Sequence, residues 1–145
     1  MDIRVLQYFL AVAREENITK AAQSLHISQP SLSKQLMSLE SELGKKLLIR
    51  GKRKITLTED GILLRKRADE IVTLLEKTER EISADDEKIS GIVSVGGSPT
   101  ITILNAAADI RKNYSDINFR FYGSDAIDVA ERLEHGMLDF AIFLE

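Results

Sequence analysis

The stretch AAQSLHISQPSLSKQLMSLE, residues 21–40, decides how the first part of this chain folds. Leu32, Leu36 and Leu39 recur at spacings of four and three residues, which places them on one face of a helix. The opposite face carries short polar and basic side chains, namely Gln29, Ser31, Ser33, Lys34, Gln35 and Ser38. The leucine face predicts burial, and the question that remains is what the polar face contacts.

Composition limits the answer. A chain of 145 residues that is 43% hydrophobic and 30% charged can bury one ordinary core or two small ones. With no Cys and two isolated His, the chain lacks ligands for a zinc site, so we expect neither a metal nor a cofactor. No segment approaches the roughly 18 apolar residues of a membrane span. We therefore expect a cytoplasmic protein without a membrane partner.

Charge is distributed unevenly along the chain. Residues 1–57 carry ten Lys or Arg against five Asp or Glu, residues 58–90 carry six against ten, and residues 91–145 carry four against eight. Because Lys and Arg contacts to phosphate supply most non-specific affinity for nucleic acid, the basic first third favours a polyanion partner. The alternative is that these charges are simply solvated at the surface and bind no partner.

Two short helices are predicted in front of the leucine stripe. Ile3, Leu6, Leu10 and Ala13 mark the buried face of the first, which Asn17 is expected to help end. The second is expected to begin at Thr19 as its N-cap, with its two alanines and Leu25 facing inward. A tight connection at His26 then leads into the third helix.

The third helix is predicted to start at Ser28 as N-cap, with Pro30 in its first turn. Leu43 should close the buried stripe, and Gly44 should end the helix. Two such helices with a short connection form a helix-turn-helix, whose second helix lies in the DNA major groove. Gln can pair with adenine and Lys with guanine, whereas for any one of these residues simple solvation is an equal alternative.

The segment KKLLIRGKRKITLT, residues 45–58, predicts two strands joined by a turn at Gly51. Four cations crowd that turn, namely Arg50, Lys52, Arg53 and Lys54. A basic hairpin beside a helix-turn-helix would lie against phosphates or reach a minor groove. On another protein a cationic turn would usually serve solubility alone.

The run LQYFLAVAREENITKAAQSLHISQPSLSKQLMSLESELGKKLLIR, residues 6–50, followed by LTEDG, residues 57–61, resembles the N-terminal part of LysR-type transcriptional regulators. The resemblance implies a winged helix-turn-helix that binds promoter DNA as a dimer. It implies base contacts by Gln29, Pro30, Ser33 and Lys34. It implies DNA backbone or wing contacts by Thr19, Ser28, Ser31, Arg50, Lys52, Arg53 and Lys54. Leu48, where Phe is usual in the family, and Asn17, where Ser is common, are departures that leave DNA binding in place.

Partners also follow from the resemblance. They are double-stranded promoter DNA, a second copy of the chain in a homodimer, and RNA polymerase. Members of the family often assemble as tetramers through their effector domain, but a dimer is as far as this chain predicts. The effector would be a small molecule whose identity the sequence does not reveal.

Residues 58 to about 85 predict a long helix with Thr58 as cap and two acidic residues in its first turn. A heptad seam for pairing with a second copy follows from the spacing of Leu64, Ala68, Ile71, Leu75, Thr78 and Ile82. The alternative is a helix that packs on the core of its own chain. We expect a DNA-binding domain over residues 1–58, a dimerising helix over 59–88 and an effector-binding domain over 89–145.

The remaining residues predict a βαβαβ run, half of an open α/β domain, so the fold class is α+β with several domains. Ligands of such folds bind at the loops that follow the strands, here residues 96–100 and 123–125. From the residues alone, each loop could equally be a plain helix cap. The family's effector domain resembles a periplasmic binding protein, so the resemblance to the family implies effector contacts by Ser98, Thr100 and Ser124, whereas Asp125 is expected to cap a helix. Because the family carries a second α/β subdomain, we expect this chain to be truncated and to bind effector weakly or not at all.

Catalytic patterns are not apparent. Gly96–Gly97 lacks the third glycine of a dinucleotide fingerprint and the Lys of a phosphate-binding loop, and no Ser lies in a nucleophile elbow. We therefore expect a regulator and not an enzyme. The alternative is a small-molecule-binding α/β module whose helical front serves protein association, a function for which a basic helix and hairpin would have no evident use.

Overall fold

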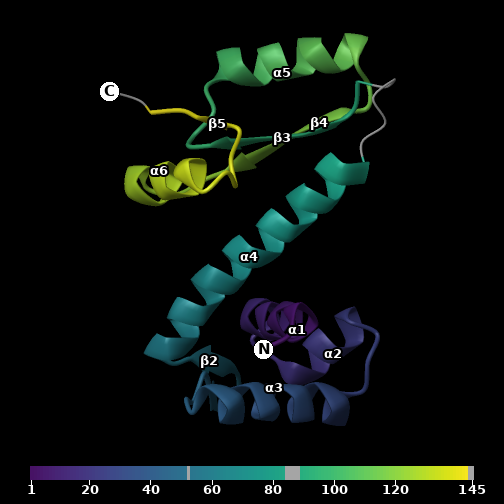
Figure 1. Ribbon diagram of the computed structural model, residues 1–145. Coiled ribbons are helices and arrows are strands. Elements are labelled where there is room, and N and C mark those ends of the chain that lie inside the picture. The colour runs from purple at the N-terminus through teal and green to yellow at the C-terminus, as the bar shows by residue number, and fades with distance from the viewer. Residues whose placement is uncertain (52, 84–88, 144–145) are drawn as a thin grey trace. The chain divides into compact units, whose positions relative to one another are not determined.

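The computed structural model describes residues 1–51, 53–83 and 89–143. The chain forms two compact units, residues 1–72 (unit 1) and 73–145 (unit 2), with the boundary inside one long helix. Figure 1 shows the elements in chain order. Each unit is described by itself below.

Three helices build the core of unit 1: α1 (Ile3–Glu15), α2 (Ile18–Ser24) and α3 (Gln29–Leu43). Asp2 caps α1 by accepting a hydrogen bond from the Arg4 amide at 2.8 Å. The fully enclosed side chains come from all three helices and include Phe9, Val12, Ala21, Leu32, Leu36 and Leu39. A completely buried Leu contributes roughly 1.5–3 kcal/mol by leaving water, so the leucine stripe fixes how α3 faces its neighbours.

The start of α2 differs from the prediction. Asn17, and not Thr19, is its N-cap, because the Asn17 side chain accepts from the Lys20 amide at 3.0 Å. α1 ends at Glu15, and the left-handed conformation of Glu16 (φ 50°) turns the chain. The short amide of Asn17 therefore begins the second helix and does not end the first.

The ends of α3 follow the prediction, but its buried face does not follow it completely. The Ser28 hydroxyl accepts from the Ser31 amide at 3.3 Å, and Gly44 ends the helix with a φ of 64°. Leu43, predicted to be buried, is 40% exposed, while Glu40 is buried. The reason is that the chain after Gly44 returns beside Glu40, so Leu43 stays at the surface.

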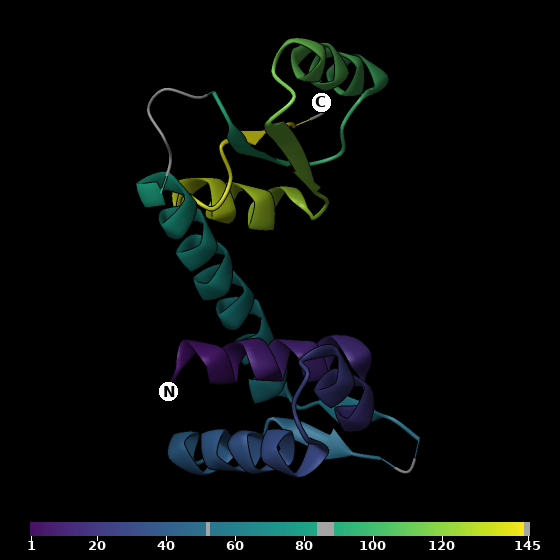
Figure 2. The same ribbon diagram turned by 90° about the vertical axis from the view of Figure 1, so that its right-hand side faces the viewer.

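A two-stranded antiparallel hairpin follows α3, made of β1 (Leu48–Arg50) and β2 (Ile55–Leu57). We call the two strands and their connecting turn the wing. Leu48 and Leu57 are partners at its base, and the Gly51 amide donates to the Lys54 carbonyl at 3.0 Å near its tip. Figure 2 shows the wing extending sideways from the helices of unit 1. The predicted wing is confirmed.

α4 (Glu59–Ser83) begins directly after the wing. The Thr58 hydroxyl accepts from the Gly61 amide at 3.0 Å and donates to the Lys46 carbonyl at 2.6 Å, so it caps α4 and ties it to the residues before β1. Gly61 is buried in this first turn. A Cβ at Gly61 would lie 2.2 Å from the Leu47 carbonyl oxygen, so only glycine permits this approach of α4 to the residue before β1.

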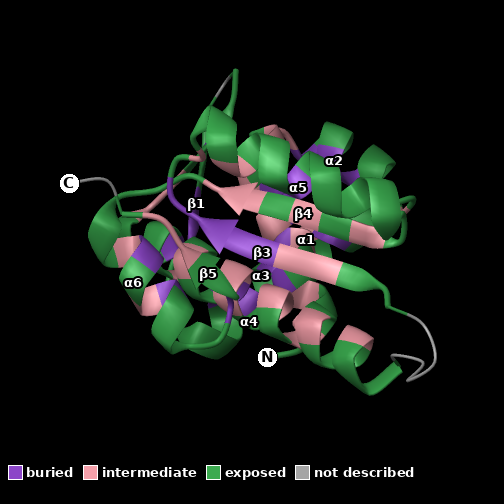
Figure 3. Cartoon of the chain, turned by 90° about the horizontal axis from the view of Figure 1, so that it is seen from above, coloured by how far each residue is buried: buried purple, intermediate pink, exposed green. Residues whose placement is uncertain are grey.

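Unit 2 contains a parallel sheet in the order β4-β3-β5, made of β3 (Gly91–Gly96), β4 (Ile117–Tyr122) and β5 (Phe140–Ala141). α5 (Ile101–Asn113) and α6 (Ala126–Glu134) lie on opposite faces of the sheet (Figures 1 and 2). Figure 3 shows that burial in the sheet concentrates in the second half of β3.

The predicted βαβαβ order is confirmed, with a shorter last strand than expected. β5 covers two residues because its partner β3 ends at Gly96, and the chain turns away at Gly97 with a φ of 97°. None of the helices in the described ranges combines the length and apolar character that crossing a membrane requires.

We expect Gly61→Ala to lower the free energy of unfolding of unit 1 by about 1–3 kcal/mol, because the added methyl meets a backbone oxygen that cannot move aside. Alanine's better helix propensity offsets less than about 1 kcal/mol of that loss. Urea unfolding followed by circular dichroism measures the change. Gly123→Ala is the control, since nothing lies within 4 Å of its added Cβ, and equal effects of the two substitutions would contradict the explanation.

Candidate nucleic-acid interface

The outer face of α3 is mainly polar, with Met37 exposed among its polar side chains. Gln29, Pro30, Lys34, Gln35 and Ser38 are exposed, and Ser33 is half-buried at the edge of this face. The predicted base-contact residues thus lie together in the first two turns of α3. Short and flexible polar side chains at the start of an exposed helix permit close approach to base edges in a major groove.

One side-chain hydrogen bond orders this face. The Gln29 amide nitrogen donates to the Ser33 hydroxyl at 2.9 Å, one helical turn further along. The bond engages one Gln29 N–H and leaves the second N–H and the carbonyl oxygen for a ligand. Gln29 is therefore partly oriented before any partner arrives.

The residues predicted to contact the DNA backbone lie on several elements. Thr19 and the neighbouring Lys20 are exposed in the first turn of α2, where backbone N–H groups and the helix dipole also favour anions. Ser31 is exposed in the first turn of α3. Ser28 uses its hydroxyl to cap α3, so the structure gives it a local role first.

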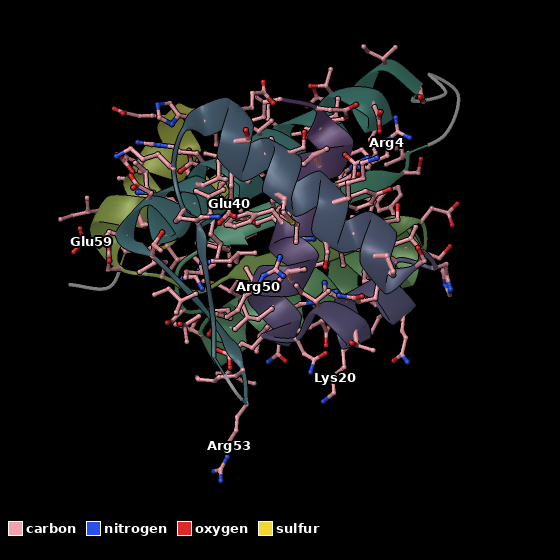
Figure 4. All side chains as sticks on the ribbon, turned by 90° about the horizontal axis from the view of Figure 1, so that it is seen from below. Arg4, Lys20, Glu40, Arg50, Arg53 and Glu59 are labelled. Carbon is pink, nitrogen blue, oxygen red and sulfur yellow. The ribbon has the colours of Figure 1, made fainter. Side chains whose placement is uncertain are left out.

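The wing supplies the cations. Arg50, Arg53 and Lys54 are exposed, and Figure 4 shows Arg53 projecting from the tip of the wing, with Lys20 projecting from α2. Lys54 already pairs with Glu16, the Nζ and Oε2 atoms being 3.2 Å apart, so a phosphate would have to compete for it. Lys52 lies outside the described residues.

Glu40 joins α3 to the base of the wing. Its Oε1 accepts from the Leu47 and Leu48 amides at 2.8 and 3.2 Å, and its Oε2 accepts from Lys46 Nζ at 3.1 Å. Burial raises the pKa of this carboxyl, but the hydrogen bonds from the two amides and from Lys46 outweigh burial and hold the pKa below its ordinary value. The charged form is therefore the one that stabilises the fold.

A lowered pKa makes the Glu40 contribution dependent on pH. An unfolded Glu titrates near pH 4.3, so the stabilisation is complete above about pH 5 and is lost as pH falls through 4.3 and then through the lower pKa of the folded state.

We expect Glu40→Gln to be less stable than the unsubstituted protein at pH 7, with the difference shrinking as the pH approaches about 3. Urea unfolding at several pH values measures the difference in stability, and Glu79→Gln, at an exposed position of α4, is the control. A difference that stays constant with pH would contradict a charged, hydrogen-bonded Glu40.

The predicted heptad seam divides into two groups in the structure. Leu64 packs against the core of unit 1, Ala68 is buried and Leu75 is half-buried. Ile71, Thr78 and Ile82 are exposed, and two apolar residues outside the predicted seam, Leu63 and Leu74, are exposed on the same side of α4. The exposed, mainly apolar stripe is thus Leu63, Ile71, Leu74, Thr78 and Ile82.

An open pocket of about 240 Å³ lies at the carboxyl ends of the strands in unit 2. Ser98 and Ser124 line it, together with Gly97, Ala126 and the apolar residues Val129, Ile142 and Phe143. Thr100, predicted to accompany them, is the N-cap residue of α5 without a side-chain cap bond and is not part of the lining. A Cβ at Gly97 would lie 2.3 Å from the Ile142 carbonyl oxygen, so glycine is required at this position of the pocket lining.

Side chains around α6 hold the second loop of the pocket. Asp125 caps α6 by accepting from the Asp128 amide at 2.9 Å, as predicted. Asp128 accepts from the Tyr122 hydroxyl at 2.9 Å and from Arg132 Nε at 3.3 Å. Burial raises the pKa of the Asp128 carboxyl. Its hydrogen bonds with Ser124 and Tyr122 and the charge of Arg132 outweigh burial and hold that pKa below its ordinary value.

Sequence reasoning missed Glu40, Lys20 and the glycine at 61. Glu40 had a usable signal, because it follows Leu36 by four residues and so lies on the buried side of α3. Lys20 could have been found by its position in the first turn of the second helix. Nothing local marks Gly61, since its requirement comes from the Leu47 carbonyl.

A three-helix core, a helix-turn-helix with an exposed second helix and a basic hairpin together define a winged helix-turn-helix protein. Residues 3–62 match the sequence profile "Bacterial regulatory helix-turn-helix protein, lysR family". Residues 3–62 are a helix-turn-helix domain of the LysR family of bacterial regulators.

Named relatives support that assignment. The chain is 37% identical to the HTH-type transcriptional regulator BsdA of Bacillus subtilis, over 98% of this chain and 50% of the relative. It is 33% identical to the nitrogen assimilation regulatory protein nac of Escherichia coli, over 100% of this chain and 49% of the relative. The chain therefore spans about half the length of the curated relatives it matches.

Two solved structures are similar. One is the BenM DNA-binding domain in complex with the catB site 1 DNA, with 39% identity and a TM-score of 0.53, over 59% of this chain and 100% of that chain. The other is full-length CbnR complexed with its target DNA, with 29% identity and a TM-score of 0.72, over 95% of this chain and 48% of that chain. DNA is thus present in structures that resemble either the first part of the chain or most of it.

Proposed function

We propose that this protein is a sequence-specific DNA-binding transcriptional regulator of the LysR type. The observation that carries the proposal is the polar outer face of α3, which is exposed at one side of unit 1 together with a wing whose tip is cationic. The DNA complexes of similar proteins support it. Regulation and not catalysis is the proposed activity, in keeping with the named relatives.

In this proposal α3 enters a major groove. Gln29 presents an amide for adenine, Lys34 presents an ammonium for guanine O6 and N7, and Ser33 keeps Gln29 oriented. Pro30 contributes apolar contact at the start of the helix. Thr19, Ser28 and Ser31 lie near the phosphates, and Arg50, Arg53 and Lys54 of the wing neutralise further phosphates, with Lys52 assigned to the same role from the sequence.

The proposed active form is a homodimer paired through α4. The exposed stripe of α4 supports this, because a charged helix seldom leaves several large apolar residues in water unless another surface covers them. Two-fold symmetry of the protein then implies a roughly palindromic operator.

The pocket of unit 2 is the proposed start of an effector site. Its two serine hydroxyls and apolar lining suit a small molecule with at least one polar group. Because the pocket is open, we propose that tight effector binding needs contacts beyond those that line it. A regulator of this kind acts on chromosomal DNA in the cytoplasm, and RNA polymerase is its proposed downstream partner.

Selection of randomised duplex DNA by the protein, followed by sequencing, tests the proposal. We expect enrichment of a two-fold-symmetric site. The variant Gln29→Ala, Lys34→Ala should lose that enrichment while weaker, salt-sensitive binding survives, since the phosphate contacts remain. Gln7→Ala, Lys112→Ala is the matched control, because it removes the same two side-chain types from exposed helix positions elsewhere. A unit that serves only protein association would enrich no site.

Pairing through α4 predicts the effect of a charge in its stripe. Leu74→Glu should shift the protein from dimer towards monomer, because two carboxylates would face each other across the seam. Sedimentation equilibrium over a range of protein concentrations measures the shift. Glu76→Ala, on the opposite side of α4, should leave the dimer intact, and equal behaviour of both variants would argue against this interface.

A further inference from the structure

We propose that Glu40 is a positioning residue for DNA binding, one that fixes the direction of the wing relative to α3. The inference rests on the proposed function and deepens it, because it names the contact that relates base recognition to phosphate binding. Glu40 itself is buried and does not face the polar surface of α3. Figure 4 shows it beside the start of the wing, at the opposite end from Arg53.

The geometry at the base of the wing supports this role. Glu40 lies in the last turn of α3, and a single oxygen of its carboxylate accepts from two consecutive amides, those of Leu47 and Leu48. Two hydrogen bonds to consecutive backbone groups fix a peptide segment in direction as well as in place. Both leucine side chains are buried in the core, so the segment is held by both its backbone and its side chains.

A second anchor holds the other strand. The Ile55 amide of β2 donates to the Glu16 carbonyl at the end of α1, at 2.8 Å. One strand is thus fixed to α3 by a side chain, and the other is fixed to α1 by a backbone bond. If the Glu40 anchor is removed, the wing keeps its strand pairing, its tie to α1 and its buried leucines, but it loses the two hydrogen bonds that join its first strand to α3.

The reach of the side chain, and not its charge alone, is what positions the wing. Glutamine has the same length, and its carbonyl oxygen can accept from both amides, although it cannot form the ion pair with Lys46. Aspartate keeps the charge but is one methylene shorter, so it cannot reach the two amides from the same backbone position. Glu40→Gln should therefore preserve wing placement, and Glu40→Asp should disturb it.

The test uses the full chain and the duplex that it selects, below the unfolding temperature of every variant as checked by circular dichroism. Glu40→Asp should reduce affinity and make binding less dependent on salt, and Arg50→Ala, Arg53→Ala should have the same effect. The slope of log affinity against log salt should fall by about one for each phosphate that the wing no longer neutralises. Hydroxyl-radical footprinting should show reduced protection at the wing while protection by α3 remains. Glu40→Gln should bind like the unsubstituted protein.

A double-mutant cycle separates positioning from general destabilisation. In the Arg50→Ala, Arg53→Ala background, Glu40→Asp should have a smaller further effect on affinity, because two of the wing cations that it misplaces are already absent. The inference would be overturned if Glu40→Asp reduced the affinity equally in the unsubstituted protein and in the Arg50→Ala, Arg53→Ala background. An unchanged footprint of Glu40→Asp would also overturn it. If Glu40→Asp does not fold, Glu40→Leu takes its place in the cycle. Failure of the unsubstituted protein to select any duplex would overturn the proposed function instead.

Discussion

Burial of one leucine stripe determines the arrangement of unit 1. Leu32, Leu36 and Leu39 are almost completely enclosed, and each contributes roughly 1.5–3 kcal/mol by leaving water. Rotating α3 to cover its polar face would expose all three, so the opposite side of the helix must face solvent or a partner. The candidate interface is therefore a direct consequence of the core.

Polar contacts then set where the other parts of unit 1 lie. Thr58 ties the start of α4 to the segment before β1, and Glu40 ties the end of α3 to the same segment. The absence of a side chain at Gly61 lets α4 begin against the Leu47 carbonyl. These contacts meet around residues 46–48, so this short stretch relates α3, the wing and the start of α4 to one another.

Unit 2 carries its candidate site in a different way. Strands β3, β4 and β5 are parallel, so the loops after them gather at one edge of the sheet, where Ser98 and Ser124 line the same small pocket. The Tyr122–Asp128–Arg132 contacts hold α6 beside that edge. A framework of three parallel strands thus supports the loops that line the pocket.

The sequence by itself determined the order of the elements, the leucine stripe, the cap at Ser28, the glycine that ends α3 and the basic wing, because each depends on residues close together in the chain. It misplaced the start of α2, the burial of Leu43 and half of the α4 seam, and it did not reveal the role of Glu40. Only the tertiary structure decided these points. The burial of Leu43, the division of the α4 seam and the role of Glu40 each depend on residues that are distant in the sequence. The Leu47 and Leu48 amides lie beside Glu40, and the core of unit 1 lies beside Leu64. Local spacing carries no information about such partners.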